Sequence, residues 1–108
     1  MDSWLIRHGT VVDGTGAPAG LADVRVVAGR IREVGSGLRR EAGEREIDAS
    51  GCWVTPGFVD PHTHLDAQLC WDPTASPSNL HGVTSVVMGL CGFGVAPCPK
   101  DGGEYLLR

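Results

Sequence analysis

Two histidines separated by one residue stand in the stretch "DPHTHLDAQ", at positions 60 to 68. In a strand, residues two apart project from the same face, about 6.6 Å apart along the axis. Two imidazoles so placed can converge on one ion, with Zn–N bonds of about 2.0–2.1 Å. The pair His62 and His64 therefore predicts part of a metal site. The alternative is that both histidines finish a strand in a polar, solvated loop.

The residues before the pair favour a position at the end of a buried strand. The run "WVTPGFV" (53–59) is nearly continuously apolar, which is typical of a strand buried on both faces of a parallel sheet. A second such run, "GVTSVVMG", follows at 82–89. Two strands joined by a crossover indicate βα units of an α/β barrel, whose chemistry sits at the carboxyl ends of the strands. A complete barrel needs about 250 residues, so we expect the first two strands of a truncated barrel over 53–108.

Two further residues could contribute to the same site. Cys91 follows the second buried strand directly, among glycines, and its thiolate could be a metal ligand or a nucleophile. It could also be a small buried apolar residue, the commoner fate of a cysteine. Asp66 could bind substrate or orient a metal ligand, or it could cap the loop or a short helix. The other three cysteines have weaker contexts and are interpreted as structural.

The first half of the chain predicts a small β-sheet module over residues 1–52. "WLIRHGTVV" has the β-branched content of a strand, and the glycine-rich "DGTGAPAG" ends it. Val24–Val27 and Ile31–Val34 are two strand-like runs joined by a short turn containing glycine, which indicates a β-hairpin. Another short strand is expected at Glu46–Asp48.

Composition excludes several classes of function. The chain has 108 residues, a net charge of −4, 42% apolar and 20% charged residues, all ordinary for a globular domain. The basic residues are scattered, which excludes a nucleic-acid stripe and a membrane-binding face. No targeting signal or apolar run of membrane-spanning length is present, and the four cysteines lack CxxC spacing. We expect a cytoplasmic protein with reduced thiols.

Three segments together resemble one known family. "VTPGFVDPHTHLDAQ", "HGVTSVVMGLCGFGVAP" and "LIRHGTVVDGTGAPAGLADVRVVAGRIREVG" are similar to the amidohydrolase superfamily. Within it they look like the N-acyl-D-amino-acid deacylase (D-aminoacylase) family, over nearly the whole chain from Leu5 to about Pro99. PGFVDxHTH is specific for the superfamily, and the pair HTHLDAQ and HGVTxVVMGxCGFG is specific for this branch.

The resemblance implies a metal-dependent (β/α)8 barrel with a small β-sandwich built from N- and C-terminal segments. It implies hydrolysis of small-molecule N-acyl-D-amino acids to a carboxylate and a free D-amino acid. His62 and His64 match the metal pair of the first barrel strand, and Cys91 matches the cysteine ligand of this branch. One or two divalent metals, with zinc expected, would polarise the scissile carbonyl and lower the pKa of water from 15.7 to about 7.

Two departures from the family pattern restrict these expectations. Leu90 stands where the family has asparagine in GNCGFG, so a polar contact beside the cysteine is missing. The general-base aspartate and the later histidines are expected beyond Arg108, so this chain alone should be inactive. Two alternatives stay open: an amidohydrolase of cyclic amides, dihydropyrimidinase-like, or a small non-catalytic β or zinc-binding module. The oligomeric state and the preferred acyl group are not predicted.

Overall fold

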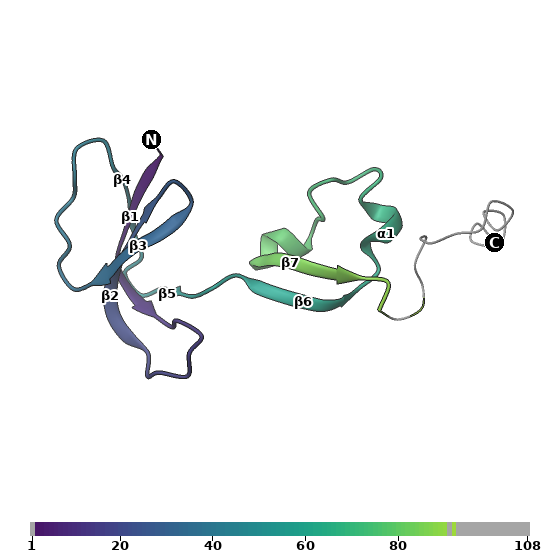
Figure 1. Cartoon of the computed structure of the whole chain (residues 1–108), viewed down its shortest axis with the longest axis horizontal. Helices are drawn as coiled ribbons and strands as arrows, with labels where there is room; N and C mark the ends of the chain where they lie inside the picture. Colours follow the sequence, from purple (N-terminus) through teal and green to yellow (C-terminus); the bar gives the residue numbers. More distant parts are fainter. Residues whose placement is uncertain (1, 91, 93–108) are drawn as a thin grey trace, which may run out of the picture. The chain divides into compact units, whose positions relative to one another are not determined.

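The structure, a computed structural model, describes residues 2 to 90 and residue 92 (Figure 1). The chain divides into two compact units, Met1–Pro56 and one that begins at Gly57. Each unit has its own sheet, and no strand is shared between the sheets. The two units are therefore described separately.

The first unit is a mixed sheet of five strands. They are β1 (Ser3–Val11), β2 (Gly20–Val27), β3 (Arg30–Gly35), β4 (Arg45–Asp48) and β5 (Trp53–Val54). The order is β3-β2-β1-β4, and β5 also pairs with β1. Strands β4 and β5 both run parallel to β1, along different parts of its length. The long β1 thus organises the whole unit.

The predicted hairpin is confirmed as β2 and β3, which pair antiparallel. Its turn residues, Ala28 and Gly29, have φ of 51° and 73°. A two-residue turn with both φ values positive has the twist that a right-handed hairpin requires. The glycine adopts this conformation freely, whereas Ala28 adopts it because the strands on both sides are paired.

The predicted strand over 53–59 is wrong as a single element. Trp53–Val54 forms β5 in the first sheet, and a new strand of the second unit starts at Phe58. The two units divide between Pro56 and Gly57, whereas the sequence predicted a boundary after residue 52. Pro56 and Gly57 interrupt the apolar run, and a proline cannot donate a ladder hydrogen bond in the middle of a sheet.

A close contact between strands explains one glycine of the first unit. A Cβ built on Gly9 would lie 2.4 Å from Val54 Cγ2 and 3.2 Å from the Cβ of Ala49. Leu5, Val24 and Ala49 are the buried apolar residues of this unit within the described part of the chain. Gly9 therefore lets β5 approach β1 closely enough to complete a small core.

The first unit also contains an ion-pair network around Arg25. Arg25 Nε donates a 2.8 Å hydrogen bond to Glu44 Oε1, and the two side chains are 10% and 2% exposed. Arg25 also contacts the carboxylates of Glu33 and Glu41. A hydrogen bond from the Glu41 backbone N–H, with those from Arg25 and Ser3, lowers the pKa of Glu44. The network joins three strands and the loop before β4 by charge-assisted hydrogen bonds.

The second unit contains a pair of parallel strands, β6 (Phe58–Thr63) and β7 (Val83–Met88). Between them lie the one-turn helix α1 (Leu65–Gln68) and the 3-10 helix η1 (Ser78–His81). The expected parallel pair with a crossover is confirmed. The expected burial on both faces is wrong for this chain, since Phe58 and Val59 are 60% and 62% exposed. Neither helix in the described residues has the length and apolar character that crossing a membrane requires.

Candidate metal site at the end of strand β6

His62 and His64 lie where β6 ends and α1 begins (Figure 1). Between them, Thr63 is 7% exposed and donates a 3.0 Å hydrogen bond from Oγ1 to the carbonyl of Val87. Because side chains alternate along a strand, burying Thr63 against β7 directs both histidines to the exposed side. The sheet itself therefore places the two imidazoles on one face.

The spacing of the two rings fits a shared ion. Their centroids are 5.7 Å apart, with the ring planes inclined by 41°. A metal–nitrogen bond of about 2.1 Å places the ion roughly 3.2 Å from each centroid, so two rings at tetrahedral or wider angles are about 5–6 Å apart. The observed separation lies in this range. The donor set, two imidazoles, is one that zinc prefers.

Two carboxylates flank the histidines and differ in their partners. Asp60 Oδ1 accepts a 3.1 Å hydrogen bond from the backbone N–H of His62, which holds the end of β6. Asp66 lies in α1, where its Oδ2 is buried and has no hydrogen-bond partner in the described residues. The N-cap residue of α1 is His64, which makes no side-chain cap bond, and Asp66 lies in the first turn of the helix. A buried carboxylate oxygen without a donor is costly unless a cation or donor reaches it.

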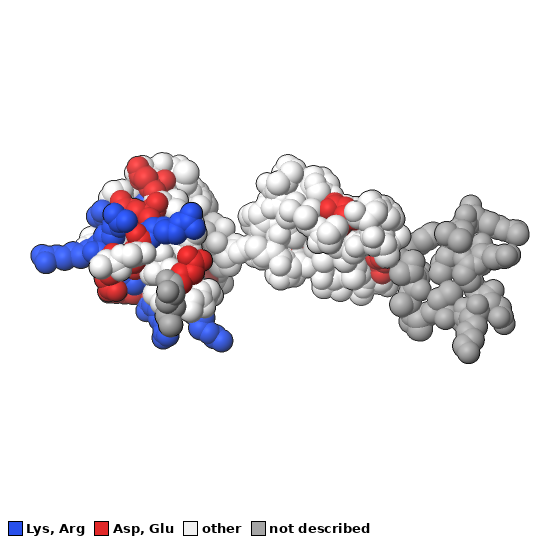
Figure 2. Space-filling model, turned by 90° about the horizontal axis from the view of Figure 1, so that it is seen from above, with Lys and Arg blue, Asp and Glu red and all other residues white. Residues whose placement is uncertain are grey.

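The described residues of the second unit, 57 to 90 and 92, include no Lys or Arg. In Figure 2 blue Lys and Arg atoms lie among red Asp and Glu atoms on the first unit, while the coloured part of the second unit shows only isolated red patches. Among the described residues of this unit, Asp66 therefore has no Lys or Arg to pair with its buried oxygen, which suits a site for a bound cation.

Cys91, the expected third ligand, lies outside the described residues, as does Cys98. The neighbouring Leu90 is 68% exposed. Cys52 and Cys70 are exposed free thiols. Within the residues that the structure describes, no group of three or more His, Cys, Asp or Glu side chains gathers around one point. The described site is thus a pair of imidazoles with Asp66 nearby in sequence.

An open hollow of about 270 Å³ contains the histidine pair. Gln68, which the sequence reasoning did not single out, lines it together with residues of the loop before η1. The spacing in the sequence could have indicated this residue, because Gln68 is four positions after His64 and so lies one helical turn away on the same face. Asp72 organises the loop: hydrogen bonds from the Thr74 hydroxyl and the Ser76 N–H lower the pKa of its carboxyl.

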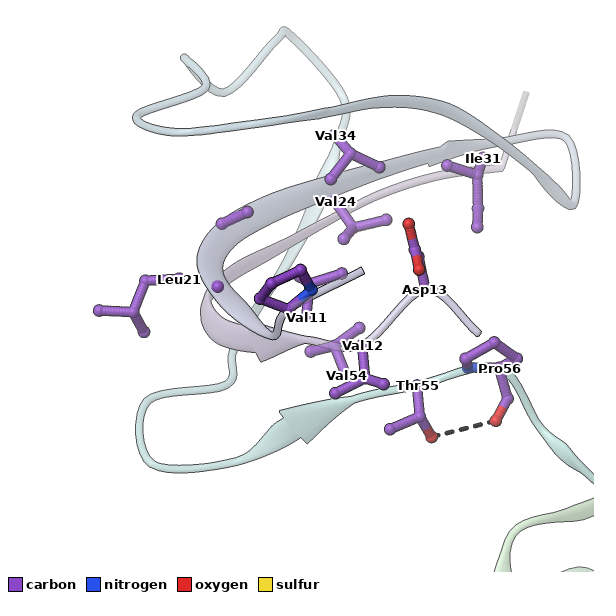
Figure 3. A pocket seen from close by; sticks show the side chains of 13 residues that line it. Val11, Val12, Asp13, Leu21, Val24, Ile31, Val34, Val54, Thr55 and Pro56 are labelled. Atoms are coloured by element: carbon purple, nitrogen blue, oxygen red, sulfur yellow. Dashed lines mark hydrogen bonds between the residues drawn. The ribbon is translucent and has the colours of Figure 1, made fainter. Parts of the chain in front are cut away.

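A larger hollow, of about 410 Å³, belongs to the first unit and has no such chemistry. Figure 3 shows Val24, Ile31 and Val34 on one side of it and Val54 and Pro56 on the other. Ile31 and Val34 are 68% and 53% exposed. The single ionisable residue lining it, Asp13, has its carboxylate bound to the backbone and hydroxyl of Thr15. This hollow is an uncovered apolar sheet face.

Comparison with known proteins adds to this geometry. A model described as "Amidohydrolase family" matches residues 45–103. An N-acyl-D-glutamate deacylase of Alcaligenes xylosoxydans xylosoxydans is 40% identical over 91% of this chain and 20% of its own length. A D-phenylhydantoinase of Escherichia coli (strain SE11) is 35% identical over 87% of this chain and 21% of its own. The chain thus spans about a fifth of the length of the curated relatives it matches.

Solved structures of similar proteins match both units. A D-aminoacylase studied for its binuclear metal centre has a TM-score of 0.79 at 45% identity, covering 87% of this chain and 20% of that one. An N-acyl-D-glutamate deacylase from Bordetella bronchiseptica, complexed with zinc and a phosphonate inhibitor, has a TM-score of 0.79 at 41% identity. It covers 89% of this chain and 20% of that one.

Proposed function

Because this chain belongs to the amidohydrolase family, we propose that it forms part of a metal-dependent hydrolase of N-acyl-D-amino acids. The products would be a carboxylate and the free D-amino acid. The observation that carries the proposal is the His62–His64 pair, held on one face at the carboxyl end of a strand paired in parallel. This is the position at which barrel enzymes carry their chemistry.

The proposed ligands in this chain are His62, His64 and Cys91. A divalent cation held there, with zinc the expected one, supplies Lewis-acid polarisation of the scissile carbonyl and of water. Two imidazoles and a thiolate match the preferences of zinc. Because zinc usually has four ligands, these three would leave one coordination position for another group. Asp66, with its buried and unpartnered oxygen, is proposed to orient a ligand or contact substrate.

The fold proposal has two parts. The second unit, which begins at Gly57, is proposed to contribute the first two strands of a (β/α)8 barrel, in which the exposed side chains of β6 and β7 would be covered by neighbouring elements. The first unit, which ends at Pro56 and includes β5, is proposed to be part of a small β-sandwich that a further segment completes. The uncovered apolar face of the first unit supports this, since a contiguous apolar face of this kind marks a contact surface (Figure 3).

The relatives support a proposal for the substrate class. Deacylases of N-acyl-D-amino acids match at 40–41% identity, whereas the D-phenylhydantoinase matches at 35%. A solved D-hydantoinase also covers only 59% of this chain, against 87% for the D-aminoacylase. We therefore place linear N-acyl-D-amino acids ahead of cyclic amides.

The direct test is to purify the full-length gene product and measure its metal content and its hydrolysis of N-acetyl-D- and N-acetyl-L-amino acids and of a hydantoin. We expect bound zinc and release of the free D-amino acid, with loss of both on treatment with a chelator. A metal-free protein that hydrolyses none of these substrates would contradict the proposal. Preferential opening of the hydantoin would move the chain to the cyclic-amide class.

A further inference from the structure

Gln68 shares a hollow with both histidines. It is the last residue of α1, four positions after His64, which lies at the N-terminal boundary of that helix. Residues four apart on a helix lie on the same face. Gln68, His62 and His64 all line the open hollow of about 270 Å³. The side-chain amide is therefore beside the proposed metal site without being a ligand in it.

The orientation of this amide is determined by its partners. Gln68 Nε2 donates to Asp72 Oδ2 at 3.2 Å and to the backbone carbonyl of Ser76. An ionised carboxylate and a carbonyl are both acceptors without a proton to offer, so only the NH2 end of the amide can face them. The oxygen Oε1 must then point away from the loop.

The loop that holds Gln68 is itself well ordered by hydrogen bonds. Asp72 Oδ2 also accepts a 2.8 Å bond from the Ser76 N–H, and Asp72 Oδ1 accepts bonds of 3.1 and 2.6 Å from Thr74. The carboxylate is thus fixed on the loop, and Gln68 is fixed on the carboxylate. In the described residues Oε1 accepts no hydrogen bond and is not among the buried unpartnered atoms, so it keeps some exposure beside the hollow that Gln68 lines.

We propose that Gln68 is a substrate-binding residue whose Oε1 accepts the N–H of the scissile amide. This inference rests on the proposed function. An amide group offers one donor, its N–H, and one acceptor, its carbonyl oxygen. A cation held by the two histidines would attract the carbonyl oxygen of the amide. Gln68 Oε1, beside the histidines, would then accept the hydrogen bond from the amide N–H. Gln68 thereby selects an amide over an ester and sets the direction in which the acyl chain lies.

The test compares an amide substrate with an ester that lacks the donor. The full-length enzyme and its Gln68→Met variant are assayed on an N-acyl-D-amino acid and on the matching O-acyl-D-2-hydroxy acid. Methionine keeps the length of the side chain and removes both polar atoms. Loss of one neutral hydrogen bond lowers kcat/KM for the amide about tenfold, with little change for the ester. Asn79→Ala, which removes a carboxamide from η1 outside this hollow, should leave both values unchanged.

The outcomes separate this inference from the proposed function. An equal loss on both substrates would show that Gln68 only supports the loop, and no loss on either would show no contact; each overturns the inference while wild-type hydrolysis stands. A wild-type enzyme that cleaves no N-acyl-D-amino acid overturns both. Gln68→Ala is measured in parallel, and its kcat/KM for the amide is compared with its kcat/KM for the ester in the same way. Retained ester turnover shows that a variant is folded.

Discussion

The two units of this chain deal with charge in opposite ways. In the first unit Arg25 and Glu44 are buried against each other, and the carboxylates of Glu33 and Glu41 complete the network. The second unit has three aspartates and three histidines between residues 57 and 92 and no Lys or Arg. Its Asp60 binds a backbone N–H, and one oxygen of Asp66 has no partner in the described residues.

This difference indicates a division of roles. In the first unit the buried guanidinium has its carboxylate partners within the same unit, as expected of a structural network. Acceptors and imidazoles without a cationic side chain suit a metal ion that is supplied from outside the chain. The largest hollow of the first unit is correspondingly apolar, while the smaller hollow of the second unit contains the imidazoles.

The largest effect is expected from removing the two imidazoles of the proposed metal site. In the full-length protein, His62→Ala with His64→Ala should abolish stoichiometric zinc and lower kcat/KM at least about 1,000-fold, since metal catalysis supplies several kcal/mol and each 1.36 kcal/mol is tenfold. Metal analysis and steady-state kinetics measure both effects. His81→Ala, an exposed histidine on η1, is the matched control. Unchanged zinc content in the double variant would refute the ligand assignment.

A smaller effect is expected at Asp66. Asp66→Asn keeps the shape and removes the charge of the buried oxygen, so metal affinity should fall about 10–100-fold, as for other residues that support metal ligands. Competition with a chromophoric chelator measures the affinity. Asp13→Asn, whose carboxylate binds only Thr15 in the first unit, should leave the affinity unchanged. Equal affinities for the wild type and the Asp66 variant would assign this aspartate a role in folding or none.

Gly9 in the first unit and Gly57 in the second unit both lie where a larger side chain would clash. A Cβ at Gly9 would meet Val54 Cγ2 at 2.4 Å, and one at Gly57 would meet Thr84 Cγ2 at 2.2 Å. We expect each Gly→Ala change to lower the free energy of unfolding by about 1–3 kcal/mol, through overpacking. Urea unfolding measures this loss.

The zinc affinity distinguishes the two glycine variants. It should fall only for Gly57→Ala, because Gly57 directly precedes β6 and hence shares a unit with the histidine pair. Gly20→Ala is the control, since a Cβ there meets nothing within 4 Å. If Gly9→Ala weakened zinc binding as strongly as Gly57→Ala, the two units would not have separate roles.

The smallest expected effect is on acid stability. The hydrogen bonds from the Glu41 N–H, Arg25 and Ser3 lower the pKa of Glu44, so its contribution is fully present above the ordinary glutamate pKa of about 4.3. That contribution is lost as the pH falls through the lowered folded-state pKa. Glu44→Gln should therefore be less stable than wild type at pH 7, with the gap narrowing in acid. Thermal unfolding across this range measures the gap, with Glu46→Gln on the exposed Arg7 pair as control.

Much of the local structure was predictable from the sequence. The β2–β3 hairpin was predicted because two strand-like runs, Val24–Val27 and Ile31–Val34, are joined by a short turn that contains glycine. The parallel partnership of β6 and β7 was predicted because apolar runs separated by a crossover segment are typical of parallel sheets. The histidine spacing predicted that both rings share a face, and they do.

What could not be predicted depends on partners far apart in the chain. Trp53–Val54 reads as a continuation toward Phe58, yet it pairs with β1, more than forty residues earlier. Arg25 and Glu44 look like ordinary surface charges in the sequence and become buried only because β2 and the loop before β4 meet. Gln68 became notable only when Asp72 and Ser76 fixed its amide.

Side-chain chemistry and short-range spacing are properties of the sequence, so the sequence determined the histidine pair of the proposed metal site and the chain's likeness to amidohydrolases. Which strand pairs with which, which charges are desolvated and which amide oxygen faces the hollow depend on contacts between distant residues. Those contacts result from competition among many partners of similar affinity, and only the folded structure decides between them.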